Sequence, residues 1–411
     1  MTTSKPPKDE NGRNEKQITR RGFMRVVPCA GLGVLLGWKN QVNLPPPANQ
    51  QLQGMVNQKP FQPFLQGRLV HVMDEDATSW NFSSSWYGYY VDQTVVDAMT
   101  EAGLLRLTGA KTIPSAWKIL VPNYTPGQTF AIKVNFNNYT HGGSDPDLEI
   151  NALIEPVNAL IRTLVMAGVP EENISVFDVT NAWHSGSMPP NSFINRCLYP
   201  GVNFVYHYGN SNPFSSTEKV QFSPTGPSIQ DLAIGNVVVD SDYLINMFVP
   251  KGHPQSGVTL GFKNHLGSID KCDKVHNYLP SNYYFDPNYS TYIDIFKNPH
   301  FGAKTVLTVC DGLFGQWEGV HGAPERWKTF GNDAPNSLFF SADPVAIDSV
   351  LTDLLEEERI QQGLGSMMNG TRDYLGLAEG EGFGIFESAD PWILPMGSDY
   401  DRIKYLFIYG V

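Results

Sequence analysis

The feature that most limits the fold of this chain is a strand–helix–strand succession in residues 129–179. Residues 129–136, TFAIKVNF, alternate apolar side chains with others, a pattern that predicts a β-strand. Residues 148–167 have the apolar spacing of an amphipathic helix that ends at Gly168, and residues 174–179 form the next apolar run. Because such units favour parallel strands joined by a right-handed crossover, the sequence predicts an α/β fold with a mainly parallel sheet flanked by helices.

Further apolar runs extend this sheet and its helices along the chain. Strands are predicted at 69–73, 201–208, 235–240, 243–249, 304–310, 337–340 and at the YLFIY run near the C-terminus. Helices are predicted at 91–107, 115–121 and 345–358, the last with Asp343 as N-cap and Pro344 as its first residue. The segments between them predict long irregular loops, and 209–230 is suited to a surface loop or hairpin.

The N-terminal segment resembles an export signal of the twin-arginine type. Arg20 and Arg21 are followed by Phe23, and an apolar run, residues 26–38, comes directly after Arg25. This run is too short and too rich in glycine for a permanent membrane span. We therefore predict that the twin-arginine translocation machinery exports the folded protein to the periplasm or cell exterior. Tethering to the membrane by an uncleaved signal is the alternative.

Composition and charge divide the chain into three parts. Residues 1–40 form the signal region, residues 41–65 a Pro/Gln/Asn-rich linker and residues 66–411 a single α/β domain. The net charge is −12, but residues 1–40 carry eight Lys/Arg and three Asp/Glu, so the remainder carries 21 Lys/Arg against 38 Asp/Glu. Nucleic acids and anionic lipids bind basic surfaces, so this acidic body argues against both as partners.

The four cysteines show no spacing typical of a metal or redox site. Cys29 lies in the signal region, and Cys197, Cys272 and Cys310 are far apart in the sequence. A cluster held by cysteine alone normally needs four thiolates, so this pattern argues against an iron–sulfur cluster. Two of the other three cysteines could form a disulfide, and the sequence does not choose the pair. The cofactor is therefore unknown, although the twin-arginine route often carries proteins that have already bound one.

The best clue to function is the stretch 249–269, VPKGHPQSGVTLGFKNHLGSI. It places five polar side chains among small and apolar neighbours: Lys251, His253, Lys263, Asn264 and His265. Because Pro254 interrupts helices, we predict a Lys-Gly-His-Pro loop that leads into a helix starting near Ser256 or Gly257. Lys263 and Asn264 are then expected to point towards the loop or solvent. Backbone amides at a helix start, with lysine and histidine beside them, predict an anion site.

Four segments within residues 129–355 form an ordered series of polar motifs. They are AIKVNFNN, VPKGHPQSGVTLGFKNHLG, VCDGLFGQWEGVHGAPER and FFSADPVAIDSVLTDLL. Their Lys-x-Asn, Pro-Lys-x-His, Lys-Asn, Asp-Gly and Asp-Pro-Val-Ala-x-Asp elements, in this order, resemble the family named only as domain of unknown function 362. The resemblance implies no established activity. Many members carry a ferredoxin-type cluster segment, and this chain contains no such run of cysteines.

The resemblance carries candidate site residues onto this sequence, and they fall into two chemistries. Lys, His, Asn and Thr side chains are suited to hold phosphate, a carboxylate or a developing oxyanion. We predict ligand binding by Lys133, Asn135, Lys251, Thr259 and Asn264, and catalysis by His253 and Lys263. Carboxylates hold hard cations such as Mg²⁺ or Ca²⁺. The candidates for a divalent cation are Asp311, Glu318 and Asp348, with His253 or His265 as further ligands.

The sequence leaves three functions open. The first is an enzyme acting on a small anionic substrate, in which Lys263 or Lys133 orients the anion and His253 is the general acid and base. The second is a non-catalytic protein outside the cytoplasmic membrane that binds a ligand or assists assembly. The third is a redox protein that has lost its iron–sulfur segment. Structural roles also stay open, namely an edge strand around Lys133 and a cap, turn or ion pair for each carboxylate.

Overall fold

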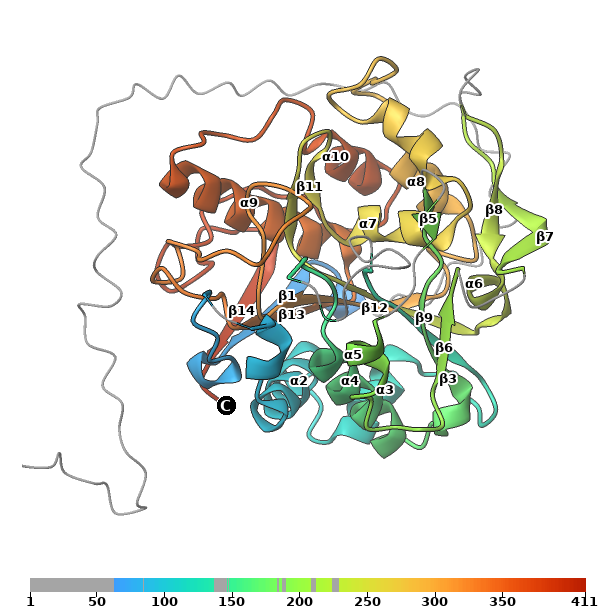
Figure 1. Cartoon of the computed structure of the whole chain (residues 1–411), viewed down its shortest axis with the longest axis horizontal. Helices are drawn as coiled ribbons and strands as arrows, with labels where there is room; N and C mark the ends of the chain where they lie inside the picture. Colours follow the sequence, from blue (N-terminus) through green and yellow to red (C-terminus); the bar gives the residue numbers. More distant parts are fainter. Residues whose placement is uncertain are drawn as a thin grey trace, which may run out of the picture.

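The structure, a computed structural model, describes residues 63–83, 85–136, 146, 148–182, 185–186, 190–207, 212–223 and 229–411. The predicted export signal and nearly all of the predicted linker lie outside these residues. Among the residues described, eight strands form one sheet in the order β14–β1–β13–β12–β9–β2–β3–β6 (Figure 1). No helix within the described ranges is long and apolar enough to cross a membrane.

The strands of this sheet are mostly parallel. They span Arg68–Met73 (β1), Phe130–Lys133 (β2), Ile174–Asp178 (β3), Asn203–Tyr206 (β6), Tyr243–Phe248 (β9), Thr305–Gly312 (β12), Ser337–Ser341 (β13) and Lys404–Tyr409 (β14). Every neighbouring pair is parallel except the two that include β13, which runs antiparallel to β1 and β12. The predicted α/β fold with a mainly parallel sheet is therefore confirmed.

Smaller strand pairs lie outside the main sheet. They are β4 (Asn181–Ala182) with β5 (Ser185–Gly186), β7 (Phe214–Val220) with β8 (Leu232–Gly235), and β10 (Lys251–His253) with β11 (Gly257–Thr259). For residues 209–230 the sequence predicts a surface loop or hairpin; β7 lies in this range and pairs with β8 just beyond it. The β10–β11 pair follows β9 directly and carries three of the predicted site residues, Lys251, His253 and Thr259.

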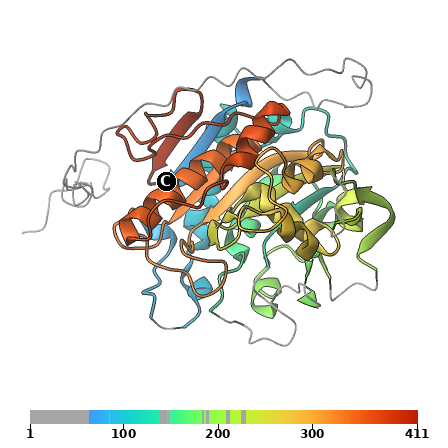
Figure 2. The ribbon, with the colours of Figure 1, turned by 90° about the horizontal axis from the view of Figure 1, so that it is seen from above.

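Helices cover both faces of the sheet (Figures 1 and 2). One face carries α2 (Gln93–Thr108), α3 (Ile113–Leu120), α4 (Ile154–Met166) and α5 (Asn191–Ile194). The other carries α7 (Gly261–Asn264), α8 (Thr291–Lys297), α9 (Pro344–Gln362) and α10 (Asp373–Gly380). Alternation along the strands supplies a core to each face: Val70 and Val72 of β1 pack on the α2–α4 side, and Leu69 packs on the α9 side.

Short helices complete the connections between these elements. The α-helix α6 spans Asn236–Asp240. The 3₁₀ helices are η1 (Pro63–Leu65), η2 (Glu75–Ala77), η3 (Tyr87–Tyr90), η4 (Glu171–Asn173), η5 (His265–Ser268) and η6 (Cys272–Tyr278). Of these, η5 and η6 follow α7 and bring further side chains towards the ends of the strands.

Most predicted elements are confirmed, and those that differ do so for physical reasons. Of residues 235–240, predicted as a strand, Gly235 ends β8 and the rest form α6, because a short apolar run does not distinguish strand from helix. The helix predicted from residue 148 begins at Ile154. Residues before it pair with strand ends instead: Ala152 N donates to Asn135 O (2.9 Å) and Leu153 N to Asp311 Oδ2 (3.3 Å).

The stretch predicted as a loop and helix contains the β10–β11 hairpin instead, and the helix α7 starts only at Gly261. Gly257 opens β11 with a φ of +82°, and a Cβ there would lie 2.1 Å from Thr371 Oγ1. Only glycine fits this position without displacing the segment that precedes α10. The edge-strand alternative for Lys133 is also wrong, because β2 lies between β9 and β3.

Asp343 fastens three separate segments through backbone hydrogen bonds. As predicted it is the N-cap of α9, with Oδ1 accepting from Val345 N (3.0 Å) and Ala346 N (2.9 Å). Its Oδ2 accepts from Gly67 N (2.8 Å), just before β1, and from Ile385 N (3.0 Å) in the C-terminal region. The carboxyl is fully buried, and burial raises its pKa to about 6. One side chain thus holds α9, β1 and the C-terminal segment together.

Asp343→Ala should lower the free energy of unfolding by roughly 3 kcal/mol, because it removes a cap and leaves four buried N–H groups without an acceptor. Urea unfolding followed by circular dichroism measures the change. Asp92→Ala is the matched control: Asp92 caps α2 through Thr94 N and Val95 N at an exposed position, and its loss should cost about 1 kcal/mol. Equal losses in the two variants would contradict the special role of Asp343.

Candidate functional site

Polar side chains gather where parallel strands of the sheet end. Lys133 is the last residue of β2, Asp178 is the last residue of β3, and Lys251 follows β9 closely. Because β9, β2 and β3 are adjacent and parallel, their C-terminal ends share one edge of the sheet. We call this group the strand-end site; its members are Lys133, Asn135, Asp178, Lys251, His253, Thr259, Lys263, Asn264 and His276.

Lys133 and Asp178 form a buried ion pair at the centre of this site. Lys133 Nζ lies 3.3 Å from Asp178 Oδ2, and the two side chains are 1% and 0% exposed. Asp178 also accepts from Phe136 N (2.8 Å) and Thr180 N (2.9 Å), so its carboxylate is held by backbone on both sides. Gly267 packs against the pair, where a Cβ would lie 2.6 Å from Lys133 Nζ. Burial lowers the pKa of Lys133, and the charge of Asp178 opposes this effect.

Two asparagines connect Lys133 to Lys251. Asn264 Oδ1 accepts from Lys133 Nζ (3.2 Å) and from Asn135 Nδ2 (3.3 Å). Asn135 Oδ1 in turn accepts from Lys251 Nζ (2.7 Å). Asn264 Nδ2 donates to Asn246 Oδ1 (2.8 Å) in β9, which fixes the orientation of the amide. The expectation that Asn264 points towards solvent is wrong, because its exposed fraction is 2%.

Lys251 and Thr259 face each other across the β10–β11 hairpin. Residues directly opposed in antiparallel strands place their side chains on the same face. Lys251 is completely buried, and Thr259 Oγ1 is buried without a hydrogen-bond partner in the described part of the chain. Burial lowers the pKa of Lys251 to about 7; Asp178 opposes the shift, and the positive charges of Lys133 and Lys263 add to it. This pair of donors is the least satisfied part of the site.

The ring of His253 is held by its own hairpin turn. Its Nδ1 accepts from Gln255 N (3.0 Å) and Ser256 N (3.1 Å). A nitrogen that accepts two N–H groups carries no hydrogen, so the neutral ring presents Nε2–H as a donor. Burial lowers the pKa of His253, and the charges of Lys263 and His276 lower it further. The geometry therefore suits a hydrogen-bond donor better than a general base.

Lys263 is partnered by a histidine. Its Nζ lies 3.2 Å from His276 Nε2, and His276 Nδ1 lies 3.1 Å from the carbonyl oxygen of Cys272. A carbonyl oxygen only accepts, so Nδ1 carries the hydrogen and Nε2 accepts from Lys263. Burial lowers the pKa of His276 to about 3 and that of Lys263 to about 7. Lys263 is only 8% exposed, so the expectation that it points towards solvent is wrong.

Of the three predicted cation ligands, Asp348 has a clear structural role. It lies in α9 with an exposed fraction of 0% and accepts from Gly261 N (2.8 Å) and Phe262 N (3.1 Å) at the start of α7. Tyr374 OH donates to the same carboxyl (3.1 Å). Burial raises the pKa of Asp348 to about 7. The protein's own carboxyl thus takes the helix-start amides that the sequence assigned to a ligand.

Asp311 and Glu318 lie elsewhere. Asp311 is buried near the end of β12 and accepts from Leu153 N (3.3 Å) and Leu313 N (3.4 Å); burial raises its pKa to about 7. Glu318 is exposed in the loop after β12. Within the described residues, no group of three or more His, Cys, Asp or Glu could hold a metal ion. The divalent cation therefore stays a prediction.

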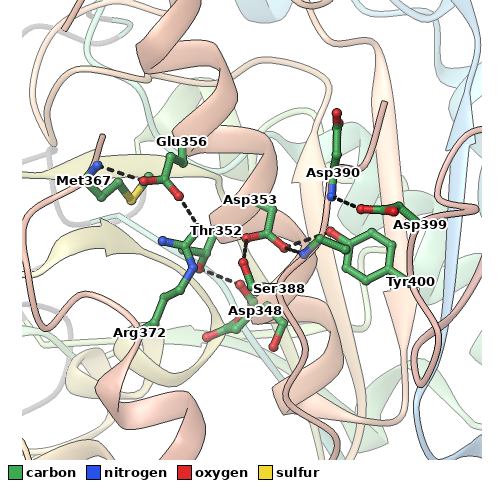
Figure 3. A network of polar contacts seen from close by, with 12 residues as sticks. Asp348, Thr352, Asp353, Glu356, Met367, Arg372, Ser388, Asp390, Asp399 and Tyr400 are labelled. Carbon is green, nitrogen blue, oxygen red and sulfur yellow. Dashed lines mark hydrogen bonds and ion pairs between the residues drawn. The ribbon is translucent and has the colours of Figure 1, made fainter. Parts of the chain in front are cut away.

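Asp353 and Glu356 of α9 hold the C-terminal segment (Figure 3). Asp353 accepts from Arg372 Nη2 (2.7 Å), Ser388 Oγ (2.7 Å) and Tyr400 OH (2.9 Å). Glu356, one turn further along α9, binds the same Arg372. Figure 3 shows these side chains converging on Asp353 from segments far apart in the sequence. This network holds Arg372 in place, and its neighbour Thr371 packs against Gly257 of the β10–β11 hairpin.

His265 and the cysteines lie near the site without completing it. His265 is buried in η5, and its ring packs against Phe296 and Phe301 at centroid distances of 6.0 and 5.3 Å. Burial lowers its pKa to about 3. Cys197, Cys272 and Cys310 are free thiols, so none of the disulfides that the sequence left open is present.

The predicted site residues do not include Asp178, Asn246 or His276. The position of Asp178 at the end of a predicted strand was a usable signal. His276 lies in a Tyr/Asn/Pro-rich segment without periodicity. The fold, and no local pattern, brings its ring within 3.2 Å of Lys263 Nζ, 13 residues earlier in the sequence. Asn246 reads as an ordinary residue of a buried strand.

Comparison with known proteins gives a family and a distant fold likeness. No curated protein matches this chain. A solved structure, the lactate racemase apoprotein from Thermoanaerobacterium thermosaccharolyticum, aligns with 13% identity and a TM-score of 0.39. The alignment covers 71% of this chain and 58% of that one, so this chain spans less than two thirds of its length. The family described as Domain of unknown function (DUF362) matches residues 131–353, more than half of the chain. This chain therefore belongs to the DUF362 family.

Proposed function

We propose that this protein is an enzyme that acts on a small anionic substrate in the strand-end site. The observation that carries the proposal is the Lys251–Thr259 pair: a fully buried lysine beside a buried hydroxyl that has no partner in the described chain. A buried hydroxyl without a partner is costly, and an anion that accepts from Thr259 Oγ1 would remove that cost. Lys251, which already donates to Asn135 Oδ1, would add a further N–H to the same anion. The positive charges of Lys133 and Lys263 act on Lys251, and Asp178 forms an ion pair with Lys133, so the site favours an anionic occupant.

The partly exposed rings of His253 and His276 lie on the outer side of the buried lysines, with ring centroids 5.8 Å apart. We propose that the substrate enters past these rings, with its anionic group towards Lys251 and Thr259. His253 Nε2–H then donates to a second oxygen of the substrate. The Lys263–His276 pair supplies proton transfer, because both members have pKa values lowered towards or below neutrality.

Other functions rest on weaker support. A binding or assembly protein would use the same anion site without turnover. An enzyme, in contrast, should convert one member of a carboxylate panel, and His253→Ala should lower its turnover by a larger factor than its affinity. A divalent cation at Asp311, Asp348 or Glu318 is supported only by the residue types, since backbone amides occupy both buried carboxyls. An electron-transfer role lacks support in the described chain, whose three cysteines are well separated free thiols.

The proposed place of action is outside the cytoplasmic membrane. Arg20 and Arg21 before the apolar run at 26–38 support export by the twin-arginine translocation machinery. Replacement of both arginines by lysine should retain the full-length protein in the cytoplasm, and cell fractionation measures it. Unchanged export of that variant would remove this part of the proposal.

Lys251→Met should weaken anion binding about tenfold to a hundredfold, which corresponds to the loss of a charge-assisted hydrogen bond. Titration calorimetry of the purified chain with oxalate, malonate and inorganic phosphate measures the affinity. Lys304→Met is the control: this half-buried lysine donates to Val238 O (2.9 Å) and lies just before β12, at the opposite edge of the sheet. Equal affinities in wild type and Lys251→Met, or no binding of any of the three anions, would contradict the proposed site.

The pH dependence of stability tests the burial of these lysines without any ligand. In the folded chain the pKa of Lys251 falls from 10.5 to about 7, so between these pH values the unfolded state binds more protons than the folded state. The stability of wild type relative to Lys251→Met should therefore rise with pH across this window. The slope is at most about 1.4 kcal/mol per pH unit, and the full penalty remains below pH 7.

Chemical denaturation at a series of pH values gives this difference curve. Lys111→Met, which removes an exposed lysine just before α3, serves as the control and should give a flat difference from wild type. The charged groups that act on Lys251 are Lys133, Lys263, Asp178 and Glu149, and all remain in the variant. A flat curve for Lys251→Met as well would show that Lys251 stays charged and solvated in the folded protein.

A further inference from the structure

The three lysines of the strand-end site have different partners and therefore different chemistry. Lys133 Nζ lies against the Asp178 carboxylate, which keeps an ammonium charged. Lys251 Nζ donates to an amide oxygen and is completely buried. Lys263 Nζ contacts the accepting nitrogen of His276, and no carboxylate in the described ranges forms an ion pair with it. It is also the most exposed of the three, at 8%.

These contacts suit Lys263 to be an uncharged amine. An ammonium that faces only a neutral ring nitrogen in a buried setting gains little from its charge. His276 is fixed in the accepting state because its other nitrogen donates to Cys272 O. A free amine on a short helix, beside a proton acceptor and close to an anion site, is the arrangement that nucleophilic lysines use with carbonyl compounds.

We propose that Lys263 forms an imine with a small 2-oxo carboxylate, and that this is the substrate class of the site. The inference rests on the proposed function, because the carboxylate group of that substrate is held by Lys251 and Thr259. His253, whose ring lies 5.8 Å from that of His276, donates from Nε2 to the ketone oxygen. A compound with a carboxylate next to a ketone matches both halves of the site.

The step balances without any further reactant. The lone pair of Lys263 Nζ attacks the ketone carbon, and the carbon–oxygen π electrons move to the oxygen. A proton passes from nitrogen through His276 Nε2 to that oxygen and gives a carbinolamine. The hydroxyl then leaves with a second proton as water, while the nitrogen lone pair forms the carbon–nitrogen double bond. No group is oxidised or reduced.

Reductive trapping tests this proposal on the full chain. Wild-type protein is treated with pyruvate and sodium borohydride, and intact mass with peptide mapping locates the adduct. We expect one adduct per chain at Lys263, at least tenfold above that at any other lysine. Treatment with acetate and borohydride, which offers no ketone, should give none. Mapping of the wild-type protein makes the result independent of whether a variant folds.

Variants separate this inference from the proposed function. Lys263→Arg should lose the adduct but keep its affinity for oxalate, whereas Lys251→Met should lose both in large part. An adduct that is absent, or spread evenly over surface lysines, in wild-type protein that still binds oxalate would overturn the imine and leave the anion site standing. Absence of both the adduct and oxalate binding would overturn the two proposals together.

Discussion

The buried ion pair between Lys133 and Asp178 is the interaction on which the rest of the site depends. Burying two charges is favourable only when they are close and their remaining hydrogen-bonding groups are satisfied. Here the ends of two adjacent parallel strands supply the charges, and Phe136 N and Thr180 N complete the carboxylate. Val179 N donates to Gly267 O (2.9 Å), so η5 is fixed against the same strand ends. The pair therefore places the segment that begins with Lys263 and Asn264.

A second internal anion places that segment from the other side. Asp348 takes the first amides of α7, and α9, which carries it, is fastened by Asp343 at its start and by Asp353 further along. The helix start is thus satisfied within the protein, whereas Thr259 Oγ1 in the strand-end site has no hydrogen-bond partner within the described ranges. The two carboxylates therefore act differently: Asp178 forms an ion pair with Lys133, whereas Asp348 caps α7.

Local sequence patterns predict the sheet well because alternation and helical spacing are local properties. The mainly parallel sheet and the cap by Asp343 follow from neighbouring residues. The strand predicted at 129–136 placed Lys133 in its interior, whereas β2 ends at Lys133. The hairpin at 251–259 does not, because its turn is decided by Gly257 packing on Thr371, far along the chain. Asp348 meets Gly261 across 87 residues, and a single sequence carries no signal of such a contact. His276 was missed because its segment has no periodicity.

Chemically identical side chains in this site acquire different roles through their partners alone. Lys133 faces a carboxylate, Lys251 an amide oxygen and Lys263 an imidazole nitrogen, so Lys133 has the partner that best supports a charged ammonium. The asparagines between them can bridge because each amide offers both a donor and an acceptor. A carboxylate in place of Asn135 or Asn264 would pair with a lysine and remove the excess positive charge. The neutral Asn135–Asn264 link therefore connects Lys133 and Lys251 without placing a second carboxylate between them.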